Sequence, residues 1–171
     1  VYGNVTLRKE QYRRSERQEE SLLIAKNCIA GKVYNSRWIL ERAVRDHALR
    51  LDGEKIRGKS RILADALSNI RSCDSAATLL GLEGEAASVY FSVFDDLILQ
   101  QKRDFVFSGR NRRPPTDEVN AMLSFSYTLL TSMCASALET VGLDPYVGFF
   151  HRDRPGRKSL ALDMVEELRA V

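Results

Sequence analysis

Apolar residues recur at helical spacing along almost the whole chain. Residues 16–50 predict one long helix or two joined helices, with Gly31 as the candidate break. Residues 56–78 predict a polar helix and a second, short one, and a further helix is expected to open at 81–84 and to continue to residue 97. No stretch shows sustained alternation of apolar and polar residues. The pattern therefore predicts an all-α, multi-helix domain with little or no sheet.

The segment between Ala121 and Val141 differs from the other predicted helices because Glu139 is its only charged residue. A helix that is apolar on all sides is typical of the centre of a bundle, so we expect this one to be buried. Thr116 is the expected N-cap, and Gly142 is expected to end the helix.

A last helix is expected to begin at Ser159, which can serve as its N-cap. Its buried face is expected to carry Leu160, Met164 and Leu168. Asp163 and Glu166 would lie about 60° apart on this helix, to one side of the apolar face. Two neighbouring carboxylates repel unless a cation lies between them or water solvates them. The spacing is therefore compatible with a metal site or with a solvated helix face.

Two further residues are candidates for chemistry. His151 follows an apolar Gly-Phe-Phe segment, and it is either a hydrogen-bonded, partly buried histidine or a ligand. Glu83 lies at the expected start of a helix, where the helix dipole favours a carboxylate without any function. The adjacent Gly84 would alternatively let a phosphate backbone come close.

Basic residues gather in two loops near these candidates. The first loop carries Lys102, Arg103, Arg110, Arg112 and Arg113, and the second carries Arg152, Arg154, Arg157 and Lys158. Acidic residues that hold a metal, next to bases that hold phosphates, suit phosphodiester chemistry, although plain solvated loops remain an alternative. The candidate DNA contacts are Arg110, Arg112, Arg113, Arg154, Arg157 and Lys158.

Composition narrows the class of protein. The chain has 171 residues, of which 44% are hydrophobic and 29% charged, as in a globular domain and unlike a disordered tail. The net charge of +3 does not by itself require a nucleic-acid partner. Three widely spaced cysteines predict buried, reduced thiols of a cytosolic protein and no zinc site. We find no apolar run approaching the roughly 18 residues of a membrane span, and therefore expect no membrane association.

Several motifs occur in a fixed order. They are Gly-Leu-Glu-Gly at 81–84, the segment 120–130, the segment 142–151 that ends in Gly-Phe-Phe-His, and the segment 159–166. Together they resemble the CRISPR-associated integrase family of spacer acquisition, in the branch found with type I systems. Lys32, Asn35 and Arg37 also resemble the family pattern, and the resemblance covers nearly the whole chain.

The resemblance implies a domain organisation. The family has an N-terminal β-rich domain followed by a helical catalytic domain. We therefore expect residues 1–15, which look irregular and then basic, to be the junction to a β-rich domain absent from this chain. Residues 16–171 would be the helical catalytic domain, with a truncated C-terminal end.

The resemblance also implies a catalytic centre. Its metal ligands would be Glu83, His151 and Glu166, with Asp163 as a further catalytic acidic residue beside the metal. Glu166 stands where some members have aspartate, which is one methylene shorter. Oxygen ligands with one imidazole suit Mg²⁺ or Mn²⁺.

The implied function is insertion of protospacer DNA into a CRISPR array, by attack of a 3′-hydroxyl on a repeat phosphodiester. The implied partners are double-stranded DNA, a second copy of the full-length protein and a small ferredoxin-like CRISPR adaptation protein, all in the prokaryotic cytoplasm. Two alternatives are a metal-dependent nuclease for branched DNA and a non-enzymatic helical interaction module.

Overall fold

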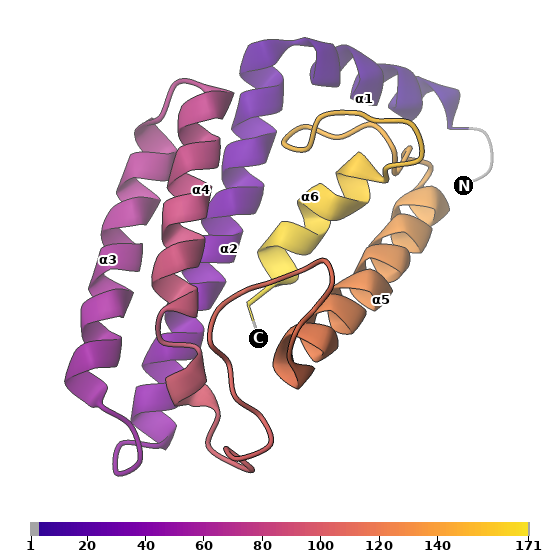
Figure 1. Ribbon diagram of the computed structural model, residues 1–171. Coiled ribbons are helices and arrows are strands. Elements are labelled where there is room, and N and C mark those ends of the chain that lie inside the picture. Colours follow the sequence, from indigo (N-terminus) through magenta and orange to yellow (C-terminus); the bar gives the residue numbers. More distant parts are fainter. Residues whose placement is uncertain (1–3, 171) are drawn as a thin grey trace.

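The computed structural model describes residues 4–170, and every regular element in this range is a helix (Figure 1). The elements are α1 (Val5–Glu16), α2 (Gln18–Asp46), α3 (Gly53–Ser72), α4 (Ala76–Phe91), the short 3-10 helix η1 (Asp95–Leu97), α5 (Glu118–Val141) and α6 (Ser159–Leu168). No strand occurs in this part of the chain. The predicted all-α fold is therefore confirmed.

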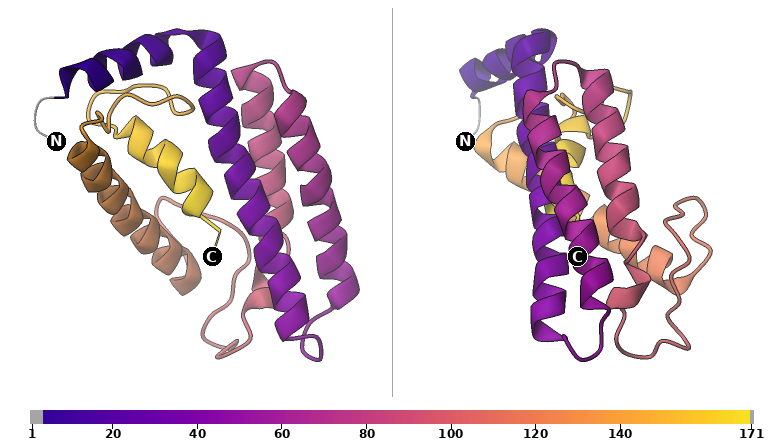
Figure 2. Two further views of the ribbon diagram at one scale, coloured as in Figure 1. Left: turned by 180° about the vertical axis from the view of Figure 1, so that it is seen from behind. Right: turned by 90° about the vertical axis from the view of Figure 1, so that its left-hand side faces the viewer.

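Helix α2 organises the molecule, because it contacts α1, α3, α4 and α6. Helices α2, α3 and α4 form a bundle, while α6 lies between α2 and α5 (Figures 1 and 2). The large apolar side chains without solvent exposure at the centre of the bundle are Ile29, Leu40, Ile56, Leu63, Ile70 and Leu79. Burial of each such side chain contributes about 1.5–3 kcal/mol, so this bundle is the stable frame on which the other helices are placed.

The long helix α2 is continuous, so the predicted break at Gly31 is wrong. The glycine instead allows α6 to come close. A Cβ built on Gly31 would lie 2.8 Å from Cγ of Glu167, which is shorter than real Cβ contacts. Gly31 is therefore a packing residue between α2 and α6.

The chain start differs from the irregular junction that the sequence predicts, since most of it is helix α1. Asn4 caps this helix by accepting a hydrogen bond from the Leu7 N–H at 3.1 Å. Gln11 then fastens α1 to the loop after α5, because its Nε2 donates to the carbonyls of Asp144 at 2.8 Å and Val147 at 3.0 Å. Of the extended or irregular piece that the sequence predicts at residues 1–5, residues 1–3 lie outside the described residues, and α1 already begins at Val5.

Helix α4 begins at Ala76, earlier than the sequence predicts. Ser75 caps it by accepting a hydrogen bond from the Thr78 N–H at 3.1 Å. The predicted second, short helix before residue 78 is therefore the first turn of α4. Glu83 lies inside this helix and not at its start, so the helix dipole does not account for its position. The predicted continuation beyond Phe91 is also wrong.

The expectation that α5 lies in the centre of a bundle is wrong. Its exposed side chains include Met133 at 68%, Phe125 at 66% and Met122 at 58%. Among the described residues, α5 is also the one helix that is long and apolar enough, by length and composition, to cross a membrane. A single such helix is weak evidence for a span, but the expectation that no apolar run reaches that length is wrong.

Helix α6 reverses the face that its sequence predicts. Leu160 is buried as expected, but Met164 is 40% exposed and Leu168 50% exposed. The helix instead turns Asp163, at 0% exposure, and Glu166, at 2%, towards the interior. A solvated helix face is therefore excluded for these two carboxylates.

The predicted helix caps are partly correct. Gly142 ends α5 in the left-handed conformation at φ 88°, as expected. Asp117 and not Thr116 is the N-cap of α5, because its side chain accepts a hydrogen bond from the backbone N–H three residues later. Ser159 is the first residue of α6, and its hydroxyl donates to the Arg152 carbonyl at 3.2 Å instead of capping the helix.

Candidate active site

Three helices bring a lysine and two glutamates together in the interior. Lys32 comes from α2, Glu83 from α4 and Glu166 from α6. The ammonium group of Lys32 donates to Oε1 of Glu83 and to Oε2 of Glu166, the latter at 2.8 Å. Lys32 is only 8% exposed. Because burying an unpaired charge costs several kcal/mol, each of these groups depends on the others.

The Asp163 carboxylate holds the loop that carries His151. It accepts hydrogen bonds from three consecutive backbone N–H groups, those of Phe149 at 2.6 Å, Phe150 at 3.0 Å and His151 at 2.9 Å. Gly148 makes this approach possible, because a Cβ there would lie 2.9 Å from Oδ2 of Asp163. A larger residue at 148 would therefore displace the loop or the carboxylate.

The ring of His151 is oriented by the same carboxylate. Its Nδ1 lies 2.7 Å from Oδ1 of Asp163. An ionised carboxylate only accepts hydrogen bonds, so Nδ1 carries the proton in this pair. The other ring nitrogen, Nε2, then faces Oε1 of Glu166 at 3.7 Å. The Asp163 carboxylate thus fixes which ring nitrogen of His151 faces the glutamates.

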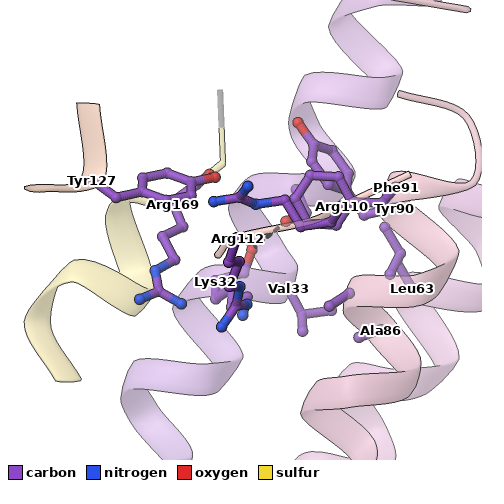
Figure 3. A pocket seen from close by; sticks show the side chains of 12 residues that line it. Lys32, Val33, Leu63, Ala86, Tyr90, Phe91, Arg110, Arg112, Tyr127 and Arg169 are labelled. Carbon is purple, nitrogen blue, oxygen red and sulfur yellow. Dashed lines mark hydrogen bonds between the residues drawn. The ribbon is translucent and has the colours of Figure 1, made fainter. Parts of the chain in front are cut away.

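One arginine pairs with Glu166, and two lie beside the ring of Tyr127. Arg169 Nη1 pairs with Oε1 of Glu166 at 2.7 Å. The guanidinium groups of Arg169 and Arg110 lie 5.3 and 5.6 Å from the ring centre of Tyr127. Figure 3 shows these side chains near Lys32, around a small cavity of about 30 Å³. Burial raises the pKa of the Tyr127 phenol, which therefore stays protonated at neutral pH.

A larger basic cavity of about 750 Å³ adjoins this cluster. Its lining includes Arg110, Arg112, Arg113, Arg154, Arg157 and Arg169, together with His151. Five of the six predicted DNA contacts thus line one cavity, and Lys158 is the exception. Arg110 is held in place, because its Nη1 donates to Oδ1 of the buried Asn120 at 2.7 Å. The cavity joins the carboxylate cluster at His151 and Arg169.

The structure thus brings the four predicted acidic and imidazole residues into one cluster. Sequence reasoning missed Arg169 and the role of Lys32, which it named only as part of the family pattern. A charged residue inside the apolar spacing of α2 was the available signal for Lys32. Nothing in the sequence alone indicated that Arg169, at the end of α6, contacts Glu166.

The residues fit a divalent ion by their chemistry. Glu83, Glu166 and Nε2 of His151 provide two carboxylates and one imidazole, which Mg²⁺ and Mn²⁺ accept. The glutamates already hold a cation between them, the ammonium of Lys32. In residues 4–170, no group of three or more histidine, cysteine, aspartate or glutamate side chains is arranged as a metal site. One oxygen of each glutamate instead accepts a hydrogen bond from the ammonium group of Lys32.

Comparison with known proteins decides the family. The sequence profile described as "CRISPR associated protein Cas1" matches residues 1–171. The chain belongs to the Cas1 family. It is similar to "CRISPR-associated endonuclease Cas1 1" of Chlorobaculum tepidum, with 48% identity over 99% of this chain and 50% of the relative. It is also similar to "CRISPR-associated endonuclease Cas1 2" of Rhodospirillum rubrum, with 54% identity over 100% and 50%.

Solved structures agree with this Cas1 assignment. A "Casposase bound to integration product" has a TM-score of 0.79 and 30% identity, and covers 98% of this chain and 45% of that chain. A "Cas6-RT-Cas1--Cas2 complex" has a TM-score of 0.83 and 27% identity, over 99% of this chain and 18% of that one. This Cas1-family chain spans about half the length of the curated relatives it matches.

Proposed function

We propose that this chain supplies the catalytic centre of a metal-dependent DNA integrase and endonuclease of CRISPR adaptation. The observation that carries the proposal is the position of the cluster of Glu83, His151 and the buried Glu166 at the edge of an arginine-lined cavity. Phosphodiester chemistry needs carboxylates for an ion and basic groups for the DNA backbone, side by side. The names of the relatives, which are endonucleases, and of the casposase bound to an integration product support this reaction class.

In this proposal, Glu83, Glu166 and Nε2 of His151 hold one Mg²⁺ or Mn²⁺ ion. The bound ion supplies stabilisation of negative charge on the phosphate as a 3′-hydroxyl displaces a strand of the repeat. Asp163 is a positioning residue, because its oxygens are occupied by the His151 ring and by three backbone N–H groups. It fixes which imidazole nitrogen faces the glutamates.

The basic cavity binds the DNA backbone. Exposed guanidinium groups attract phosphates without reading bases, so the contact is independent of sequence. We infer double-stranded DNA, namely the protospacer and the CRISPR repeat, as the substrate in the prokaryotic cytoplasm. For the full-length protein we propose a homodimer and a small ferredoxin-like partner. The Cas1–Cas2 assembly named among the similar structures supports a partner of this kind.

Strand joining by the full-length protein tests the proposal directly. A labelled DNA fragment with free 3′-hydroxyl ends is incubated with Mn²⁺, the partner protein and a plasmid that carries a CRISPR repeat. The wild type is expected to produce joined strands, and His151→Ala and Glu166→Gln are expected to reduce joining at least about 100-fold. Glu139→Gln, at an exposed position on α5, is the control. Joining by His151→Ala at the wild-type rate would contradict the proposal, and cleaved strands without joined ones would favour the nuclease.

A second experiment tests the cavity. Arg154→Ala and Arg157→Ala are expected to weaken DNA binding and to reduce its dependence on salt, because each lost phosphate contact releases about one counterion fewer. Arg61→Ala, on the exposed surface of α3, is the matched control. If DNA binding by all three variants depends on salt as it does in the wild type, the DNA binds elsewhere.

A further inference from the structure

The position of Lys32 is unusual for a lysine. Its ammonium group is buried between two carboxylates that come from different helices. Among the described residues, Lys32 is the one cationic side chain paired with both Glu83 and Glu166, since Arg169 contacts Glu166 alone. The lysine therefore lies between the side chains that the proposed metal centre needs.

We propose that Lys32 is an internal counter-cation, which holds Glu83 and Glu166 in the metal-free protein and competes with the divalent ion for them. This inference rests on the proposed metal centre. In this role the lysine has opposite effects on two quantities. The free energy by which Lys32 stabilises the metal-free protein is lost when metal binds, so it lowers the affinity for metal.

The competition follows from shared carboxylates. The ammonium uses Oε1 of Glu83 and Oε2 of Glu166, and a divalent ion held by the same carboxylates would be a second cation in the same place. Two cations at contact distance in a buried site repel strongly. Metal uptake therefore requires the Lys32 ammonium to leave at least one glutamate.

The displaced ammonium group could move towards a cavity that Lys32 already lines. Lys32 lines the small cavity of about 30 Å³, whose wall also contains Arg110, Arg112 and Arg169 (Figure 3). A fourth cationic group there strengthens the attraction for an anion, and the neighbouring basic cavity shares these three arginines. A DNA phosphate would compensate the displaced charge. Metal uptake is thus expected to strengthen DNA binding through Lys32, and DNA is expected to strengthen metal uptake.

A purely structural role for Lys32 makes a different prediction. If the lysine only joined α2, α4 and α6, its removal would loosen the glutamates and weaken metal binding. The counter-cation role predicts the opposite sign, because removal abolishes the competitor. The sign of the change in metal affinity therefore separates the two roles.

The test uses the full-length protein with Lys32→Met and Lys32→Gln. The glutamine keeps amide donors for the carboxylates, so Lys32→Gln still provides a folded protein if Lys32→Met fails to fold. Lys26→Met is the matched control, because Lys26 lies on the same helix and its Nζ donates to the Cys73 carbonyl at 2.7 Å. Mn²⁺ affinity is measured by calorimetry, and the thermal midpoint is recorded with and without Mn²⁺.

Without metal, both Lys32 variants are expected to unfold several degrees below the wild type. They are expected to bind Mn²⁺ about tenfold more tightly, and saturating Mn²⁺ should close the gap in thermal midpoint. Lys26→Met should bind Mn²⁺ with the affinity of the wild type, whatever the loss of its own hydrogen bond does to the thermal midpoint. Unchanged or weaker Mn²⁺ affinity in both Lys32 variants, with normal binding by the wild type, would overturn the counter-cation role and leave the metal centre intact. Absence of Mn²⁺ binding by every protein, the wild type included, would overturn the metal centre itself.

Discussion

Helices α5 and α6 are neighbours, but α6 buries charged side chains while α5 exposes apolar ones. On α6, Asp163 and Glu166 are buried. On α5, Phe125 and Met133 are about two-thirds exposed, at 66% and 68%. Each buried carboxylate has several hydrogen-bond or ionic partners that offset its loss of hydration. In these two helices, burial of a side chain therefore follows the partners available to it and not the hydropathy of the helix.

The comparison of the two helices predicts that the largest effect on stability occurs at Asp163. Asp163→Ala leaves three backbone N–H groups and the His151 ring without their acceptor, and should lower the free energy of unfolding by about 4 kcal/mol. Glu167→Ala, an exposed position on the same helix, should change it by less than about 0.5 kcal/mol. Urea unfolding of the two variants measures the difference. Equal losses would mean that the buried carboxylate is not a centre of stability.

Two leucines extend the comparison to apolar residues. Leu63→Ala in the bundle core should cost about 3 kcal/mol, because the side chain has no solvent exposure and leaves a cavity. Leu129→Ala on α5, where the side chain is 51% exposed, should cost less than about 0.5 kcal/mol in this chain. Thermal unfolding of both variants decides the point. A large loss at Leu129 would show that the exposed face of α5 is covered in solution.

Alanine substitutions at two glycines are expected to change stability by smaller amounts, and with opposite signs. A Cβ at Gly148 would lie 2.7 Å from Cβ of Ser159, so Gly148→Ala should destabilise the protein by about 2 kcal/mol. A Cβ at Gly81 meets open space within helix α4, so Gly81→Ala should stabilise by about 0.5 kcal/mol. Unfolding curves that shift in the same direction would contradict the crowding of the His151 loop.

The last and smallest effect concerns the thiol of Cys28, which lies near the carboxylates of α6. It is one of three free thiols, of which Cys73 alone is fully buried, so the expectation of buried thiols holds only for Cys73. Burial, and then the charges of Asp163, Glu167 and Glu166, raise the pKa of Cys28 to about 11.

Because the thiolate is the nucleophile, alkylation of Cys28 at about pH 8 should be on the order of 100-fold slower than in the unfolded chain. The raised pKa of Cys28 also links its protonation to the free energy of unfolding. The contribution of the protonated thiol to stability is complete below about pH 8.5 and is lost as the pH rises towards 11. Peptide mapping after iodoacetamide treatment measures the rate. Alkylation at the rate of the unfolded chain would contradict the raised pKa of the half-buried Cys28 thiol.

The sequence predicted the class of fold correctly and the orientation of two helices wrongly. Periodicity tells which residues share a face, but burial of that face depends on surfaces contributed by distant segments. Glu166 looked like a solvent-facing residue or a metal ligand because Lys32, its partner, is 134 residues away. The apolar composition of α5 predicted burial for the converse reason, since no described segment covers Phe125 or Met133.

The candidate site followed mainly from the order of its motifs. The resemblance named Glu83, His151, Asp163 and Glu166, and the structure places all four in one cluster. Periodicity could not predict the start of α4 at Ala76, because this start depends on a cap in which the Ser75 side chain accepts a hydrogen bond from the Thr78 N–H. It also could not show that the oxygens of Asp163 are taken up by backbone groups of the His151 loop.

The docking of α6 between α2 and α5 has a consequence for how the protein is made. Contacts among α2, α3 and α4 join consecutive segments, so this bundle is expected to form early in folding. The pairing of Lys32 with Glu166 instead closes a loop of 134 residues, and Arg169 follows only after α6. During synthesis the chain would therefore carry a folded bundle without a complete cluster until its last described helix has left the ribosome. The order of translation itself delays the assembly of the cluster around Lys32 and Glu166.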